Sequence, residues 1–143
     1  MTKRIRLVLS YSLTVLIANG IAPSLARAHS TLYSVDAASP TMLRTVNPAN
    51  GATLSSVAIS LPGFTINTAN GLASHPTTGE LFALLTLAED PACSSNTSVN
   101  GRQRRVVKVD PTTGVATSIG NTGDCFAGIA FHANGTLYGV TGK

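Results

Sequence analysis

Two kinds of turn-containing segment each occur twice along this chain of 143 residues, and this repeat limits the possible folds more than any other feature. Residues 45–57, TVNPANGATLSSV, resemble residues 108–120, KVDPTTGVATSIG. Farther along the chain, residues 71–85, GLASHPTTGELFALL, resemble residues 128–140, GIAFHANGTLYGV. The two kinds alternate in the same order, and each copy of such a repeat is usually one supersecondary unit. We therefore place the copies at roughly 42–87 and 105–143.

The repeated segments have the turn chemistry of β-hairpins. Proline presets φ for a turn, an aspartate or asparagine before it accepts backbone N–H bonds, and glycine supplies the positive φ that ends it. An Asn-Gly pair between two apolar runs is one of the strongest hairpin signals. The residues predicted to form the repeat turns are Asn47, Pro48, Gly51, Asp110, Pro111, Gly114, Asn134 and Gly135.

The segments around these turns favour strands, because they are rich in β-branched residues and partly alternate between apolar and polar side chains. No stretch after residue 28 keeps a helical period over three turns. The predicted strands are 31–36, 42–47, 52–60, 71–75, 80–87, 104–110, 114–119, 127–132 and 136–141. Many short strands joined by Gly, Pro and Asn turns indicate an all-β propeller, sandwich or barrel. Hairpins that recur in pairs give four-stranded antiparallel sheets, which favours propeller blades.

Three segments carry a resemblance to a known family. VDPTTGVATSIG, FAGIAFHANGTLYGV and NGLASHPTTGELFALL resemble the repeats of secreted bacterial β-propeller proteins of the TolB-like or NHL-like, six-bladed kind. The resemblance extends over roughly residues 32–143. It implies four-stranded blades around a shared axis, in proteins that serve as binding scaffolds, sugar or peptide readers, assembly partners and occasional hydrolases.

The length of the chain allows only a partial propeller. At roughly 40 residues per blade, residues 29–143 make about two four-stranded antiparallel blades, which cannot close a ring. Three interpretations stay open: a truncated reading frame, self-association through the uncovered blade faces, or an open β-sandwich.

The N-terminus has the layout of a cleaved signal peptide. Lys3, Arg4 and Arg6 precede an apolar stretch, and Ala26-Arg27-Ala28 is a typical cleavage site. Residues 1–28 are therefore predicted to form a signal helix that is cleaved after Ala28, with an uncleaved anchor as the alternative. Secretion or transfer to the periplasm follows from this prediction.

Cleavage also removes the basic character of the chain. The formal charge of +4 falls to zero, because residues 29–143 contain six basic and six acidic side chains. Neither nucleic acid nor a membrane is then an expected partner. The one basic cluster, RQRR at 102–105, is interpreted as a solvated loop rather than an anion-binding patch.

Two cysteines, Cys93 and Cys125, are predicted to form a disulfide because thiols tend to pair in an oxidising compartment. The alternatives are two free thiols or a link between chains. His75 and His132 occupy matching places in the two copies, which the repeat explains without a ligand. No catalytic, cofactor-binding or metal-binding residue is predicted, and no cofactor is expected.

The distinctive residues of the chain are thus explained by turns and strand packing. We expect an exported, non-enzymatic binding or structural protein whose partner is an unidentified protein or glycan. The alternative is a fragment of a propeller hydrolase, lactonase-like or phytase-like.

Overall fold

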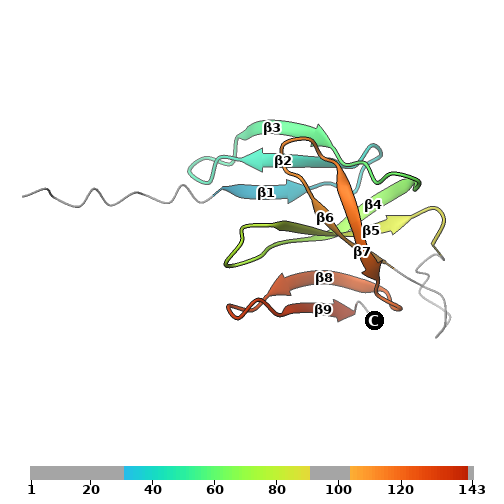
Figure 1. The fold of residues 1–143 in the computed structure, drawn as a ribbon. Helices are drawn as coiled ribbons and strands as arrows, with labels where there is room; N and C mark the ends of the chain where they lie inside the picture. Colours follow the sequence, from blue (N-terminus) through green and yellow to red (C-terminus); the bar gives the residue numbers. More distant parts are fainter. Residues whose placement is uncertain (1–30, 91–103, 142–143) are drawn as a thin grey trace, which may run out of the picture.

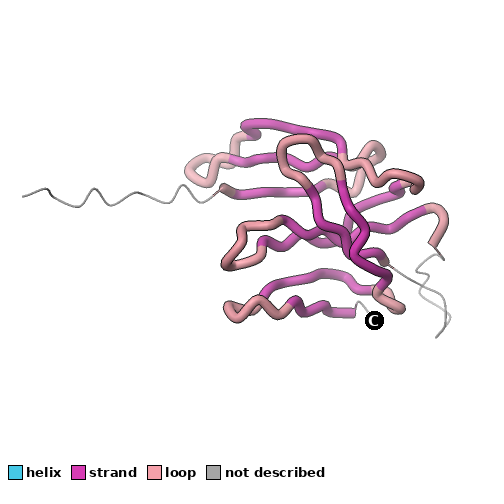
Figure 2. The backbone as a smooth tube through the Cα atoms, viewed as in Figure 1, coloured by secondary structure: helices cyan, strands magenta, loops and turns pink. Residues whose placement is uncertain are grey.

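A computed structural model describes residues 31–90 and 104–141 of the chain. The predicted signal peptide and its cleavage point after Ala28 lie outside these residues, as does Cys93. Within the described ranges the chain forms nine strands and no helix (Figures 1 and 2). The strands are β1 (Leu32–Val35), β2 (Met42–Val46), β3 (Thr53–Ala58), β4 (Ile66–Ser74), β5 (Leu81–Leu87), β6 (Arg105–Val109), β7 (Ala116–Asn121), β8 (Phe126–Phe131) and β9 (Leu137–Thr141). The all-β prediction is confirmed.

The strands are arranged in three antiparallel sheets in the part of the chain that the structure describes. The first sheet has the order β1-β2-β3, the middle sheet β4-β5-β6-β7, and the third sheet β8-β9. Within each sheet, strands that are consecutive in the sequence lie next to each other, as expected when local hairpins are the building unit.

This division differs from the expected two four-stranded sheets, because the described strands form sheets of three, four and two strands. The middle sheet takes β4 and β5 from copy 42–87 and β6 and β7 from copy 105–143. The physical reason is the pairing of β5 with β6, in which Leu81 lies opposite Val109 and Leu85 opposite Arg105. Each copy therefore contributes one hairpin to the middle sheet and one hairpin to a neighbouring sheet.

The three sheets are stacked so that the middle sheet is covered on both faces (Figure 1). Strand β5, with the sequence LFALLTL, shows this most clearly, because five of its seven residues are buried. Its odd-numbered residues share one hydrophobic cluster with residues of the first sheet and of the connection that follows it: Leu81, Ala83, Leu85 and Leu87 with Leu43, Ile59 and Leu61. On the opposite face, Phe82 contacts Phe131 of β8 with ring centroids 5.1 Å apart.

The middle and third sheets approach most closely where two glycines meet. A Cβ atom added at Gly71 of β4 would lie 3.2 Å from the Cα atom of Gly128 and 3.2 Å from the backbone nitrogen of Ile129, both in β8. Contacts this short mean that β8 would have to move by a few tenths of an ångström to accommodate a side chain at Gly71. The glycine therefore lets two strands from different sheets lie backbone to backbone.

The middle sheet is also tied to the first by hydrogen bonds. Ser60, just after β3, donates its N–H to the Gly114 carbonyl (3.1 Å) and accepts a bond from the Ala116 N–H (2.7 Å). A Cβ atom at Gly114 would lie 2.2 Å from the carbonyl oxygen of Ala58, so the turn between β6 and β7 is packed against the end of β3.

Candidate functional site

The hairpin turns β2–β3, β4–β5 and β8–β9 lie on one side of the molecule, at the left in Figure 1. The last two of these turns are in contact, since a Cβ atom at Gly135 would lie 2.9 Å from Nε2 of His75. Loops that a rigid scaffold holds together are where binding residues are disproportionately found. This side of the molecule is therefore the first place to look for a site.

The four hairpin turns β2–β3, β4–β5, β6–β7 and β8–β9 are capped in the same way. At each turn, the residue just after the first strand accepts backbone N–H bonds through its side chain. The Asn47 Oδ1 atom accepts from Ala49 (2.9 Å), and the Asp110 Oδ1 atom accepts from Thr112 (2.8 Å). Gly51 and Gly114 then adopt φ values of 74° and 75°, the left-handed region that glycine occupies without strain.

The two repeated histidines have the same role as these caps. The Nδ1 atom of His75 accepts bonds from the backbone N–H groups of Thr77 (3.3 Å) and Thr78 (3.2 Å). The Nδ1 atom of His132 accepts from Asn134 (3.2 Å), which precedes Gly135 at φ 85°. The histidines are structural parts of their turns.

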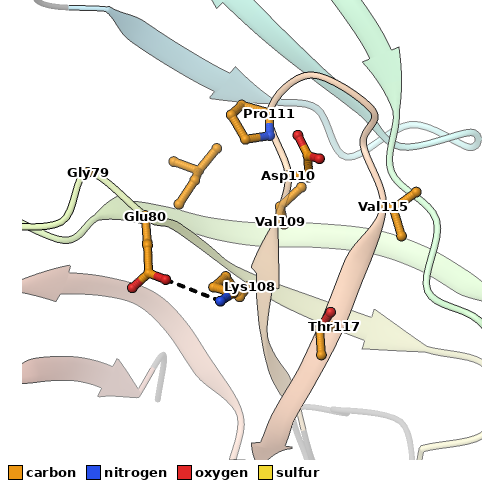
Figure 3. A pocket seen from close by; sticks show the side chains of 9 residues that line it. Gly79, Glu80, Lys108, Val109, Asp110, Pro111, Val115 and Thr117 are labelled. Carbon is orange, nitrogen blue, oxygen red and sulfur yellow. Dashed lines mark hydrogen bonds and ion pairs between the residues drawn. The ribbon is translucent and has the colours of Figure 1, made fainter.

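A shallow hollow of about 210 Å³ lies between the β4–β5 turn and the β6–β7 hairpin (Figure 3). Its lining residues are Gly79, Glu80, Leu81, Lys108, Val109, Asp110, Pro111, Val115 and Thr117. Ligand pockets for drug-sized molecules usually measure about 300–1,000 Å³. The hollow is thus smaller than such a pocket, and it suits a contact with one sugar ring or one side chain of a larger partner.

The charged groups at the hollow hold one another in place. Lys108 Nζ lies 3.1 Å from Glu80 Oε1, and the Thr78 hydroxyl donates to Glu80 Oε2 at 3.1 Å. The hydrogen bond from Lys108 is the main reason why the pKa of Glu80 is lowered. Both side chains of the pair are well exposed, so salt screens their attraction and the pair contributes little to stability.

Asp110, on the rim of the hollow, is engaged by its own turn. Its pKa is lowered, mainly because the carboxylate accepts the backbone N–H of Thr112. A carboxylate that already accepts local backbone bonds is fixed in position, and it offers an oriented negative charge at the mouth of the hollow.

The basic cluster 102–105 is described only for its last two arginines. Arg105 lies 3.0 Å from Asp90 and places its guanidinium 4.6 Å from the ring centre of Phe64. Arg104 donates to the backbone carbonyl of Phe126, and burial lowers the pKa of its guanidinium. Both arginines are thus held by the protein itself and are half-buried, with Arg105 in β6, which corrects the expectation of a solvated loop for these two residues.

Among residues 31–90 and 104–141, no three His, Cys, Asp or Glu side chains are grouped so that they could hold a metal ion. None of the segments described contains a helix long and apolar enough to cross a membrane. The predicted disulfide involves Cys93, which lies outside the described residues, so the pairing of Cys93 with Cys125 stays a prediction. No protein-family model matches the chain, and no curated protein is detectably similar to it.

Proposed function

We propose that this chain is an exported, non-enzymatic scaffold whose three sheets are consecutive blades of a β-propeller and whose hairpin turns bind a protein or a glycan. The observation that carries the proposal is the burial of β5 on both faces. In an open sandwich of two sheets, each sheet has one face on the core and one face on solvent. A sheet covered on both faces by like sheets is instead the arrangement of a propeller blade within its ring.

The contacts of β4 support the same assignment. Strand β4, the first strand of the middle sheet, contacts β8, the first strand of the third sheet, and it also lies against β1. In a propeller, the first strands of successive blades lie next to one another around the axis. The close approach of Gly71 to Gly128 provides such a contact between first strands.

The binding role rests on the hollow and on the β6–β7 turn beside it. Polar side chains that do not cap a turn, such as Thr112 and Lys108, stand exposed there beside apolar Pro111 and Val115. Mixed polar and apolar surface next to a fixed backbone is suited to recognition of a sugar ring or a peptide segment.

A binding screen tests this proposal. The processed product of the full chain is immobilised and probed with a glycan array and with extracellular protein fractions. We expect a partner that binds at micromolar concentrations. Its binding should be lost with Lys108→Glu at the hollow and retained with Ser55→Glu, at an exposed position on β3 of the first sheet. Absence of any partner together with measurable hydrolytic turnover would overturn the proposal.

The export part is tested separately. Amino-terminal sequencing of the product recovered outside the cytoplasm should begin at His29, directly after the predicted cleavage point. Recovery of the chain only in the cytoplasm with Met1 retained would contradict export without affecting the assignment of the fold. Elemental analysis of the same sample addresses the hydrolase alternative, which requires a stoichiometric divalent ion.

A further inference from the structure

Three strands are versions of the same four-residue motif. These are Leu32–Val35 in β1 (LYSV), residues 81–84 in β5 (LFAL) and residues 137–140 in β9 (LYGV). In each strand, the second and fourth residues are large and apolar and point to the same face, because side chains alternate along a strand. The third sheet therefore has the same kind of apolar face as the other two sheets.

In the first two versions this face is covered by the next sheet. Tyr33 and Val35 pack against the hydrophobic cluster that the first sheet shares with the middle sheet. Leu84 is fully buried, and Phe82 meets the ring of Phe131 from the third sheet. In both cases the next sheet of the stack packs on this face.

In the third version the same face is exposed. Tyr138 is 58% exposed and Val140 is 63% exposed, although they correspond to Phe82 and Leu84. Ala130, which pairs with Tyr138 across the sheet, is exposed as well. We call Ala130, Tyr138 and Val140 the β9 face.

The backbone of the β9 face is also open to close approach. A Cβ atom at Gly71 of the middle sheet would meet backbone atoms of the neighbouring strand at 3.2 Å, whereas one at Gly128 would meet only the Val140 side chain, at 3.8 Å. Gly128 corresponds to Gly71 in the repeat. The third sheet therefore has a glycine, Gly128, at the position where Gly71 lets the middle sheet lie close to β8.

The opposite end of the stack presents the complementary surface. In the middle sheet, the paired residues Leu81 and Val109 are each 2% exposed, since the first sheet covers them. Their counterparts in the first sheet are Leu32 and Val46, which are paired in the same register, and Leu32 is 50% exposed. We call Leu32 and Val46, with Arg44 on the same side of β2, the β1 face.

We propose that the β9 face of one molecule packs on the β1 face of a second copy of this chain. The contact repeats the sheet-on-sheet packing that the molecule already uses twice internally, and the two surfaces it needs are both on this chain. A second copy is therefore the occupant that the structure specifies. Tyrosine and arginine, which the two faces contribute, are residues enriched at protein interfaces.

Because the two faces differ, the association is head-to-tail. Such a contact produces a closed ring when the rotation between copies closes, and otherwise an open chain of molecules. The proposal depends on the observed packing of the sheets and not on the proposed ligand binding, so either can fail without the other.

Sedimentation velocity of the processed product of the full chain tests the proposal. Between about 1 and 100 μM, a range that brackets the affinities of weak complexes, the wild-type mass should rise to multiples of the monomer. Tyr138→Glu with Val140→Glu, and separately Leu32→Glu, should each weaken self-association by at least about 30-fold, the effect of losing a hot-spot residue. Ile119→Glu serves as the control, because Ile119 is exposed on β7 but belongs to neither face.

A mixing experiment distinguishes this interface from a symmetric one. Each of the two variants keeps one intact face, so an equimolar mixture should form heterodimers that stop at two chains. If the β9 face bound its own copy, the Leu32→Glu variant would associate like the wild type. Circular dichroism and urea midpoints equal to those of the wild type should show that the exposed substitutions leave the fold intact. A wild-type chain that stays monomeric at 100 μM, or association that Ile119→Glu abolishes equally, would overturn the proposal.

Discussion

The hairpins β4–β5 and β8–β9 have similar sequences and nearly opposite surroundings. In the first, Leu84 is wholly buried between sheets, and in the second the corresponding Val140 lies in solvent. Both segments form an antiparallel hairpin with a histidine cap and a positive-φ glycine in the turn, although the β4–β5 turn is one residue longer. The local sequence has thus determined the conformation of both. Burial, in contrast, is determined by the presence of a neighbouring sheet. Strand formation and core formation are thus separable properties of this chain, and paired substitutions in the two hairpins can measure each.

The largest difference is expected for truncation of the matched aliphatic residues. Leu84→Ala should reduce the free energy of unfolding by about 2–5 kcal/mol, because it leaves a cavity between packed sheets. Val140→Ala should change it by less than about 0.5 kcal/mol in dilute, monomeric samples. Urea denaturation followed by circular dichroism measures both. Equal losses would mean that β9 is covered in the monomer as β5 is.

The matched glycines should give a smaller difference of the same sign. Gly71→Ala should cost about 1–3 kcal/mol, because the new methyl group meets backbone atoms of β8 at 3.2 Å and the sheets must separate. Gly128→Ala should be nearly neutral in the monomer, yet it should weaken self-association. Urea midpoints and sedimentation of the two variants provide the measurements. A neutral Gly71→Ala would show that the middle and third sheets are not in tight contact.

The matched histidines should differ less. His75→Ala removes a turn cap and also the edge-on contact with Phe131 at 4.9 Å, so it should cost about 1 kcal/mol. His132→Ala removes a cap from an exposed turn and should cost less. His75→Asn supplies an acceptor of the kind seen at Asn47 and should recover part of the loss. Thermal melts of the three variants test this order, which a larger effect at His132 would contradict.

The smallest effect concerns the charge of a cap. The pKa of Asp110 is lowered in the folded chain, chiefly by the Thr112 N–H bond. Its contribution is therefore fully present above the pKa of the unfolded chain and is lost as pH falls through the folded value. Between about pH 5 and pH 3, the urea midpoint of the wild type should decline slightly more steeply than that of Asp110→Asn. Parallel declines would show that the turn does not depend on the charge.

Strand positions could be predicted well from the sequence, because each hairpin carries its own turn residues and its own β-branched flanks. The main error is the start of β4, expected at residue 71 but observed at Ile66. The residues Ile66 to Asn70 read INTAN, without clear alternation, and the pairing with β5 contains two register shifts. Tertiary pairing, which local sequence does not encode, extends this strand.

The grouping of strands into sheets could not be predicted in the same way. Turn chemistry specifies that β4 pairs with β5 and β6 with β7, but the pairing of β5 with β6 joins strands separated by residues 88–104. In contrast, the capping role of the histidines could be predicted from the sequence. HPTTG at 75–79 and DPTTG at 110–114 differ only in their first residue, which indicates that both first residues have one role.

The interchangeable caps have a consequence for how a surface like this one can diversify. Asparagine, aspartate and histidine all satisfy the same backbone groups at equivalent turns, although only aspartate is an anion and only histidine has an aromatic ring. A single codon change at these points therefore alters the electrostatic character of one rim of the molecule while the backbone beneath it stays the same. Selection can act on what the rim attracts or repels without passing through a misfolded intermediate.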